Sequence, residues 1–283
     1  MTQQLDPRVR EIAEDFCRRV HAVRPGLVEA VHVTGSALTD DWQPAHSDVD
    51  TVFVVARPVD AADAEQLGAL HAATARDEAE RGNPVDGVYL TAAELAAGPD
   101  EVAAAPQVVN GVLTLEKPGG QLSWVTWLEL GASPVGRVDA TTGAMTWSEP
   151  VGVTPEVRAK AAGFSRDNLA TYWAGIAEEI DAWLAGPESP DDPDAEVHDS
   201  VLTWGVLGAP RLLATIEHGR VLSKSASGDF ALQRWPSYTD LICRCQRSRA
   251  GQEERFTVRD AHEGLGLLRA VLAAGKAAPT HVR

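Results

Sequence analysis

The chain has few of the residues that mark disulfide-rich or zinc-binding proteins. It contains three cysteines in 283 residues, Cys17, Cys243 and Cys245, and their number and spacing suit neither a disulfide framework nor a zinc-binding cluster. Its eight histidines are scattered, and no two lie four residues apart, as they would to share one helix face. We therefore expect reduced, packed cysteines and no metal site built from histidine.

Long apolar runs are also missing. The segment after Met1, TQQLDPRVREIAEDF, has neither the basic start nor the apolar core of a secretory signal. No later run approaches the roughly 18 apolar residues that a membrane span needs. We expect a cytoplasmic protein without a membrane partner.

Basic residues are outnumbered. There are 41 acids against 25 lysines and arginines, which gives a formal charge of −16. This balance argues against nonspecific binding to nucleic acid and is compatible with cationic ligands. An ordinary soluble surface would carry such a charge as well, so the charge alone identifies no partner.

The periodicity of apolar residues predicts a small sheet with helices in the first half of the chain. Asp6 and Pro7 suit the cap and first turn of a helix. Its apolar residues follow at helical spacing: Val9, Ile12, Phe16 and Val20. Three β-branched, apolar runs predict buried strands: 27–34, 49–56 and 84–91. The alanine-rich segment 60–82 predicts a further helix, and for 92–150 we expect short strands and loops.

The pattern changes after about residue 150, where strand signals nearly vanish and the period becomes helical. A chain of 283 residues suits two domains, each with its own core. We therefore predict an α+β protein with a mixed sheet and flanking helices in residues 1–150 and an all-α helical bundle in residues 151–283.

Two acids stand at the start of the second predicted strand. Residues two apart in a strand point to the same side, so Asp48 and Asp50 present neighbouring carboxylates. Two anions about 4 Å apart repel by roughly 4 kcal/mol at an effective dielectric of about 20, so they need a cation or a proton. Mg²⁺ typically uses one or two protein carboxylates with water and phosphate oxygens, which this pair supplies.

A glycine and a serine precede these acids. Gly35 allows the backbone to approach an anion closely, and the N–H groups that follow it, with the Ser36 hydroxyl, can bind phosphate oxygens. A third acid, Asp86, lies on the next predicted strand and could share the metals or accept a proton from an attacking hydroxyl. Taken singly, each feature is also typical of a turn, a cap or a solvated loop; it is their joint spacing that favours a site.

The segment EAVHVTGSALTDDWQPAHSDVD resembles the signature of DNA polymerase β-like nucleotidyltransferases, and more narrowly that of streptomycin/spectinomycin aminoglycoside adenylyltransferases. The resemblance implies that Asp48 and Asp50 bind the metal and that Gly35 and Ser36 hold the triphosphate of ATP. Asp86 then stands where that family has its catalytic base, normally a glutamate. Aspartate is one methylene shorter than glutamate, so its carboxylate has a shorter reach.

The segment RLLATIEHGRVLSK extends the resemblance into the helical half. It implies that Arg211 and Lys224 contact the nucleotide phosphates, with Arg220 as an adjoining basic position. Two such cations would neutralise the triphosphate and the charge that develops in the transition state. The alternative is an ordinary solvated helix face.

Candidate acceptor contacts follow from the same resemblance. Acids at the start of the long central helix hold the cationic drug in that family, and here Glu196 and Asp199 are the candidates, although the alignment needs an insertion of about one turn before Arg211. Charge at a helix N-terminus explains them equally. Trp124 and Trp127 could stack on the acceptor, or pack in the core.

The resemblance predicts an enzyme that transfers AMP from Mg²⁺-bound ATP to a hydroxyl of a small acceptor, with an aminoglycoside favoured and a monomer sufficient. Two other classes are open. Arg211 and His218 lie seven residues apart, as in helical ribonuclease toxins that partner small nucleotidyltransferases. A binding protein without activity is disfavoured because all three carboxylates are present.

Overall fold

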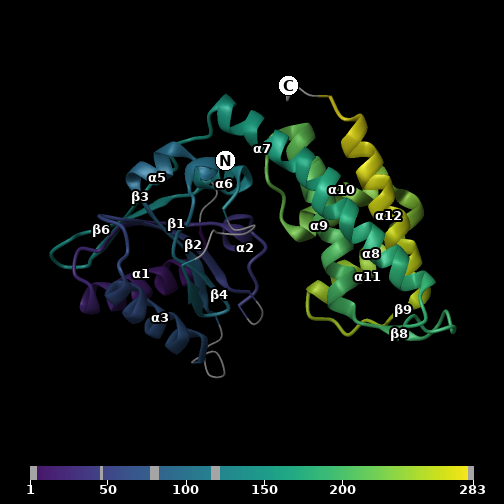
Figure 1. Cartoon of the computed structure of the whole chain (residues 1–283), viewed down its shortest axis with the longest axis horizontal. Helices are drawn as coiled ribbons and strands as arrows, with labels where there is room; N and C mark the ends of the chain where they lie inside the picture. The colour runs from purple at the N-terminus through teal and green to yellow at the C-terminus, as the bar shows by residue number, and fades with distance from the viewer. Residues whose placement is uncertain (1–4, 45–46, 77–82, 116–121, 280–283) are drawn as a thin grey trace. The chain divides into compact units, whose positions relative to one another are not determined.

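The computed structural model describes residues 5–44, 47–76, 83–115 and 122–279 (Figure 1). It divides into two compact units, Met1–Val157 and Arg158–Arg283. The first contains a mixed sheet with helices and the second is helical, so the predicted α+β class is confirmed. Among the described residues no helix combines the length and apolar character needed to cross a bilayer.

The first unit is built on a seven-stranded sheet in the order β5-β4-β3-β2-β1-β6-β7. Its strands are β1 (Val28–Val33), β2 (Val49–Val55), β3 (Val85–Thr91), β4 (Gln107–Val109), β5 (Val112–Thr114), β6 (Val135–Val138) and β7 (Met145–Ser148). Only β2 and β3 pair in parallel; the other described pairs are antiparallel. The parallel pair lies at the centre, and β2 and β3 are almost continuously buried because helices cover both faces.

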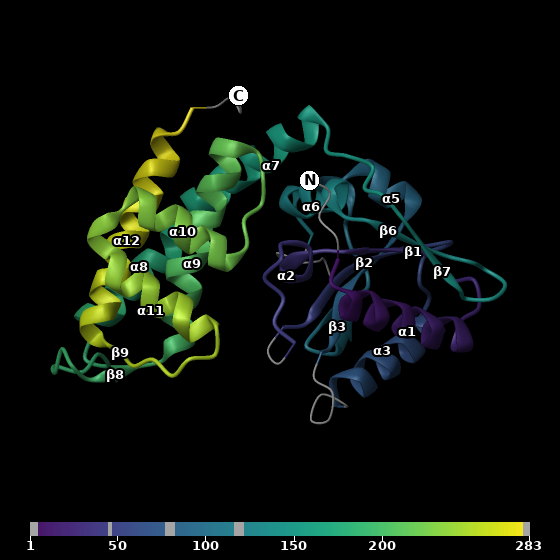
Figure 2. The same ribbon diagram turned by 180° about the vertical axis from the view of Figure 1, so that it is seen from behind.

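Helices α1 (Pro7–Val23) and α3 (Ala61–Arg76) cover one face of the sheet, and α5 (Ala92–Ala97) and α6 (Trp124–Ala132) cover the other (Figures 1 and 2). A four-residue helix, α2 (Gly35–Leu38), follows β1, and a short 3₁₀ turn spans Pro99–Glu101. On the α1 and α3 face the core is aromatic, with the Phe53 and Tyr89 rings stacked at 4.6 Å between centroids. Val52 and Val88 face the opposite core with Trp127.

The predicted helix at the start of the chain and the three predicted strands are confirmed. Asp6 caps α1 by accepting the Arg8 N–H at 2.7 Å. The predicted helix 60–82 is α3, with residues 77–82 outside the described part of the chain. The short strands expected in 92–150 are present, but α5 and α6 also lie there, so our expectation of strands and loops alone was wrong. The β-forming residues of α6 become helical because tertiary packing overrides propensity.

The second unit is a helical bundle, as predicted. A nearly continuous helical stretch comprises α7 (Pro155–Asn168), a π-helical turn (Leu169–Trp173) and α8 (Ala174–Ala185). The other elements are α9 (Asp199–His218), α10 (Lys224–Arg234), a 3₁₀ turn (Pro236–Tyr238), α11 (Thr239–Arg249), α12 (Val258–Ala277) and the two short strands β8 (Glu196–Val197) and β9 (Phe256–Thr257). Helix α9 contributes buried residues such as Leu207 and Leu213 to the central core.

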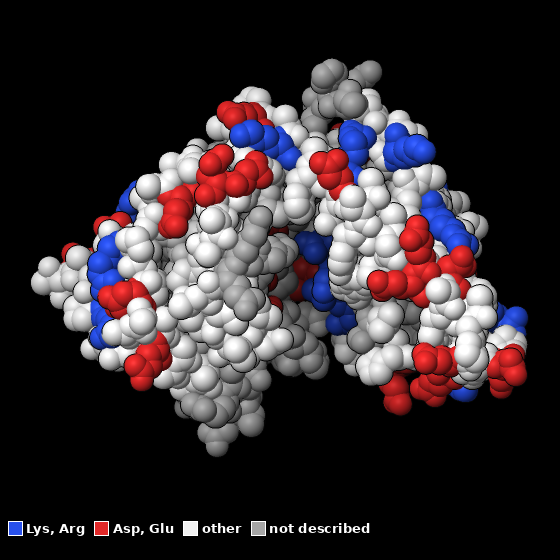
Figure 3. All heavy atoms as spheres, viewed as in Figure 1, with Lys and Arg blue, Asp and Glu red and all other residues white. Residues whose placement is uncertain are grey.

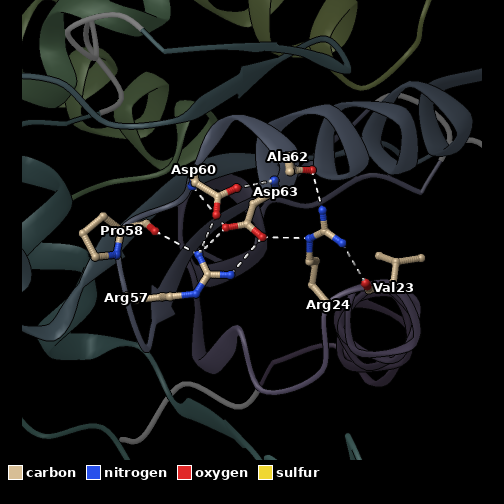
Figure 4. A network of polar contacts seen from close by, with 7 residues as sticks. All are labelled: Val23, Arg24, Arg57, Pro58, Asp60, Ala62 and Asp63. Atoms are coloured by element: carbon tan, nitrogen blue, oxygen red, sulfur yellow. Dashed lines mark hydrogen bonds and ion pairs between the residues drawn. The ribbon is translucent and has the colours of Figure 1, made fainter.

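A buried carboxylate ties the elements around α3 together (Figure 4). Asp63, 1 % exposed, accepts from Arg24 Nε at 2.7 Å and pairs with Arg57. Asp60 and Asp63 also cap the helix reciprocally, each carboxylate accepting the other residue's N–H. The Arg57 guanidinium lowers the pKa of Asp63 to about 2. The network therefore joins the ends of α1 and β2 to the start of α3.

We expect Asp63→Asn to lower the free energy of unfolding by about 2 kcal/mol at pH 7. A carboxyl group whose pKa is lowered by folding stabilises the folded state at pH values above its unfolded pKa of roughly 4. In the wild type this contribution is lost as the pH falls from about 4 to about 2, and the variant should lack that part of the pH dependence. Urea unfolding at several pH values measures it. Asp15→Asn, which breaks an exposed pair, is the control and should change stability by less than about 1 kcal/mol; an equal loss in both variants would contradict the prediction.

Candidate functional site

The site predicted from the sequence begins where Gly35 packs against Asp50. Gly35 has a φ of +64°, which favours glycine, and a Cβ built there would lie 2.1 Å from Asp50 Oδ2. Thr34, the residue before it, donates its N–H to Asp50 O at 2.9 Å. The end of β1 and the start of β2 are therefore held together, and no side chain larger than hydrogen fits between them.

Asp48 and Asp50 are partly exposed and flank Val49, which is fully buried. Because side chains alternate along an extended chain, both carboxylates leave on the side away from Val49. Trp42 fixes the backbone at Asp48, because its indole N–H donates to the Asp48 carbonyl oxygen at 3.0 Å. Ser36, also partly exposed, follows in the first turn of α2. The structure thus brings the predicted Gly-Ser and Asp-x-Asp segments to one end of β1 and β2.

Asp86 lies beside Asp50, because the two residues are paired in the parallel register of β2 and β3. It is only 2 % exposed. Its two oxygens accept the N–H groups of Asn110 at 2.6 Å and Gly111 at 3.2 Å. These residues have positive φ values of 52° and 72° and form the two-residue turn between β4 and β5. Asp86 therefore stabilises a hairpin turn in this structure.

The described residues contain no group of three or more histidine, cysteine or acidic side chains placed to hold a metal ion together. The three carboxylates predicted as metal ligands, Asp48, Asp50 and Asp86, are thus neighbours in the sheet without forming a three-carboxylate cluster. Asp48 and Asp50 alone still match the one or two protein carboxylates that Mg²⁺ uses when phosphate oxygens and water complete its shell. The donor chemistry of this pair fits such an ion.

Glu129 is a functional candidate that sequence reasoning missed. It lies on α6, is 8 % exposed, and accepts the Gly35 N–H at 3.3 Å through Oε2. Its carboxylate oxygen stands where a phosphate oxygen bound at Gly35 would accept the same N–H. The segment around it reads as an apolar helix, and nothing local points to Gly35, which is 94 residues away.

His32 is a second missed residue. It lies on β1 two residues before Thr34, is 7 % exposed, and its Nδ1 has no hydrogen-bond partner among the described residues. By alternation along β1 its side chain lies on the face opposite Val31 and Val33, which pack with α1 and α3. Burial, with a contribution from Arg137, lowers the pKa of His32 to about 4. The imidazole is therefore neutral at pH 7 and adds no positive charge beside the carboxylates.

In the helical unit, Arg211 on α9 donates from Nε to Leu222 O at 2.7 Å. Gly219, with a left-handed φ of 59°, ends α9, and Lys224 begins α10 two residues after Leu222. Arg220 is exposed in the same connection. The segment that carries the resemblance therefore comprises the end of α9, a short connection and the start of α10, and Arg211 has a structural contact as well as its predicted one.

The predicted acceptor contacts of this unit are exposed. Glu196 in β8 lies 3.5 Å from Arg255, and Asp199 is the first residue of α9, with Oδ2 3.2 Å from Ser248 Oγ. These two acids lie close in sequence at the N-terminal end of α9. His218, at the other end of the helix, is exposed and contacts the Phe230 ring edge-on.

The two tryptophans of α6 differ. Trp127 is 9 % exposed, packs in the core with Val52 and Val88, and donates its indole N–H to Leu95 O at 3.0 Å. Trp124 is partly exposed and donates to Asp100 Oδ2 at 2.9 Å. Core packing, the alternative left open from the sequence, therefore describes Trp127, and Trp124 packs at the edge of the same core with part of its side chain exposed.

Comparison with known proteins agrees with this architecture. Residues 9–99 match the model of a nucleotidyltransferase domain, and residues 166–270 match that of the aminoglycoside adenylyltransferase C-terminal domain. The chain belongs to the aminoglycoside adenylyltransferase family of nucleotidyltransferases. The predicted resemblance is thereby confirmed at the level of the family.

One solved structure that is similar to this chain is that of the spectinomycin adenyltransferase AAD(9) from Enterococcus faecialis, crystallised with ATP and spectinomycin. The likeness covers 94 % of this chain and 98 % of that one, with a TM-score of 0.55 and 14 % identity. No curated protein matches the sequence. Family membership makes the chain an enzyme of the nucleotidyltransferase class. The 14 % identity to the solved structure supports a shared fold but does not identify the acceptor.

The contact between Gly35 and Asp50 gives a direct test of the site. In Gly35→Ala the new methyl would displace the Asp50 carboxylate, so we expect nucleotidyl transfer to fall by about 100-fold, as a misplacement of about 1 Å can cause. Pyrophosphate release measures it. Gly152→Ala is the matched control, because Gly152 also has a positive φ, 92°, but no described atom within 4 Å of the added Cβ. Equal activity in the two variants would contradict the assignment.

Proposed function

We propose that the protein transfers AMP from Mg²⁺-bound ATP to a hydroxyl of an aminoglycoside, with release of pyrophosphate. The observation that carries this proposal is the contact of Gly35 with Asp50, beside Asp48, in a nucleotidyltransferase domain that is followed by an aminoglycoside adenylyltransferase C-terminal domain. The proposal for ATP is supported by the solved relative, which was crystallised with that nucleotide.

The nucleotide is proposed to bind through backbone N–H groups, a hydroxyl and basic side chains. Gly35 and Ser36 would contact the triphosphate with backbone N–H and hydroxyl donors, which requires the Glu129 carboxylate to leave the Gly35 N–H. Arg211, Lys224 and Arg220 would supply positive charge to the phosphates. Bound at Asp48 and Asp50, Mg²⁺ would supply charge neutralisation of the phosphate oxygens.

The acceptor hydroxyl is proposed to lose its proton to a carboxylate while its oxygen attacks the α-phosphorus of ATP and the bond to pyrophosphate breaks. Asp86 is the proposed base because it pairs with Asp50 in register. Glu196, Asp199 and Trp124 are the proposed acceptor contacts: two exposed carboxylates suit the amino or guanidino groups of the drug, and an accessible indole suits a sugar or guanidinium face.

Pyrophosphate release from Mg²⁺-bound ATP with streptomycin, spectinomycin or kanamycin as acceptor tests the activity and its substrate. We expect release with streptomycin or spectinomycin, and in Asp50→Asn a loss of at least about 100-fold, because a metal-binding carboxylate is removed. Asp40→Asn, at an exposed acid with a φ of 55° that asparagine tolerates, is the matched control and should retain activity. No release with the first two drugs would refute the proposed acceptor class.

A separate comparison tests the proposed base. If Asp86 accepts the proton, Asp86→Asn should lower kcat by about 100-fold or more and remove the acidic limb of the pH profile of kcat. The same variant should also lower the melting temperature, because Asp86 holds the turn at Asn110 and Gly111. A folded variant with reduced stability, unchanged kcat and an unchanged pH profile would show that Asp86 is structural. Glu129→Gln, measured alongside, tells whether the neighbouring carboxylate has the catalytic role instead.

A further inference from the structure

The helical unit contains a cavity of about 560 Å³, and of its lining residues the proposed function uses only Glu196, as a candidate acceptor contact. Its floor is apolar and buried, formed by Leu202 and Val206 of α9 and by Leu265 and Leu268 of α12. This volume falls in the range of about 300–1,000 Å³ that is typical of sites for small organic molecules. The cavity therefore has room for an apolar body of drug-like size.

The rim of this cavity is acidic. Glu179, Glu188 and Glu196 line it, and its described lining residues include neither lysine nor arginine. Glu196 lies 3.5 Å from Arg255, whereas Glu179 and Glu188 form no ion pair with any described residue. Trp183 and His198 also line the cavity. Figure 3 shows acids and bases interspersed over one face of the molecule.

Within the unit, the cavity and the basic residues lie on different faces of α9. The lining positions of this helix are Val201, Leu202, Gly205 and Val206. At 3.6 residues per turn, Arg211 lies about 150° around the helix from their middle. A ligand in the cavity would therefore not contact the Arg211 side of α9, where the nucleotide phosphates are proposed to bind.

We propose that this cavity binds an amphiphilic organic cation, with its aromatic or alkyl body on the apolar floor and its ammonium group at the glutamate rim. The inference does not rest on the proposed activity, which involves one residue of this cavity, Glu196, as a candidate acceptor contact. The apolar floor excludes a highly hydroxylated polycation, for which burial without hydrogen-bond partners is costly. The acidic rim excludes an anion of the same size.

The charge preference is tested with three probes that share one body: 4-phenylbutylamine, 4-phenylbutanol and 4-phenylbutyrate. Isothermal titration calorimetry of the full-length protein at low salt should give a single saturable site for the amine, with binding at least about fivefold weaker for the alcohol and weakest for the acid. Binding of the amine should weaken as salt is added. Absence of saturable amine binding, or equal binding of the acid, would overturn the proposal.

The location is tested by filling the cavity. Gly205 lines it, and a Cβ built there meets no described atom within 4 Å, so Gly205→Leu should place its side chain in the free volume. We expect amine binding to weaken at least about tenfold. Gly175→Leu is the matched control, because Gly175 is also helical, has the same open space and does not line the cavity. Equal amine affinity in the two variants would place the ligand elsewhere.

The rim is tested independently, which keeps the proposal falsifiable if Gly205→Leu fails to fold. Glu179→Gln and Glu188→Gln together should weaken the amine at least about fivefold and leave the alcohol unchanged. Glu178→Gln is the control. Glu178 precedes Glu179 on α8 but does not line the cavity, so this change removes a charge from the same helix outside the rim. Amine binding that is unaffected by the paired change, or weakened equally by the control, would contradict the proposed role of the rim.

Discussion

The close contact of Gly35 with Asp50 is the constraint on which the candidate active site depends. A backbone with positive φ turns the chain directly out of β1 into α2, and the absence of a side chain lets the Asp50 carboxylate lie against it. The Thr34 N–H to Asp50 carbonyl bond fixes the same junction from the backbone side. A negative group and the N–H groups that begin α2 are thereby placed next to each other, which suits a bound cation and phosphate together.

Carboxylates gather near this junction from three separate elements. Asp50 and Asp86 are aligned by the parallel pairing of β2 and β3, and Glu129 reaches Gly35 from α6. Their surroundings differ: the two oxygens of Asp86 accept the N–H groups of a turn at 2.6 and 3.2 Å, whereas Glu129 accepts the Gly35 N–H at 3.3 Å. Groups of the same chemical type therefore have different hydrogen-bond partners.

The helical unit uses α9 in two ways. Its C-terminal half carries Arg211, which joins the turn before α10 through Leu222 O, and its N-terminal half forms one wall of the cavity with α8 and α12. One long helix thus connects a basic region to an apolar, acid-rimmed cavity.

Sequence alone determined the local parts of this picture. The Gly-Ser and Asp-x-Asp pattern, the strands beside it and the basic segment after residue 211 were predicted correctly as elements, because period, caps and spacing act over a few residues. It did not reveal α5, which is only six residues long, or α6, whose aromatic and β-branched residues become helical by packing against the sheet. Only the tertiary structure placed Asp86 on the Asn110 and Gly111 turn, brought Glu129 to a glycine 94 residues away, and formed the cavity from α8, α9, α12 and β8. These features depend on contacts between distant segments, and no local pattern of residue types encodes which distant groups will meet.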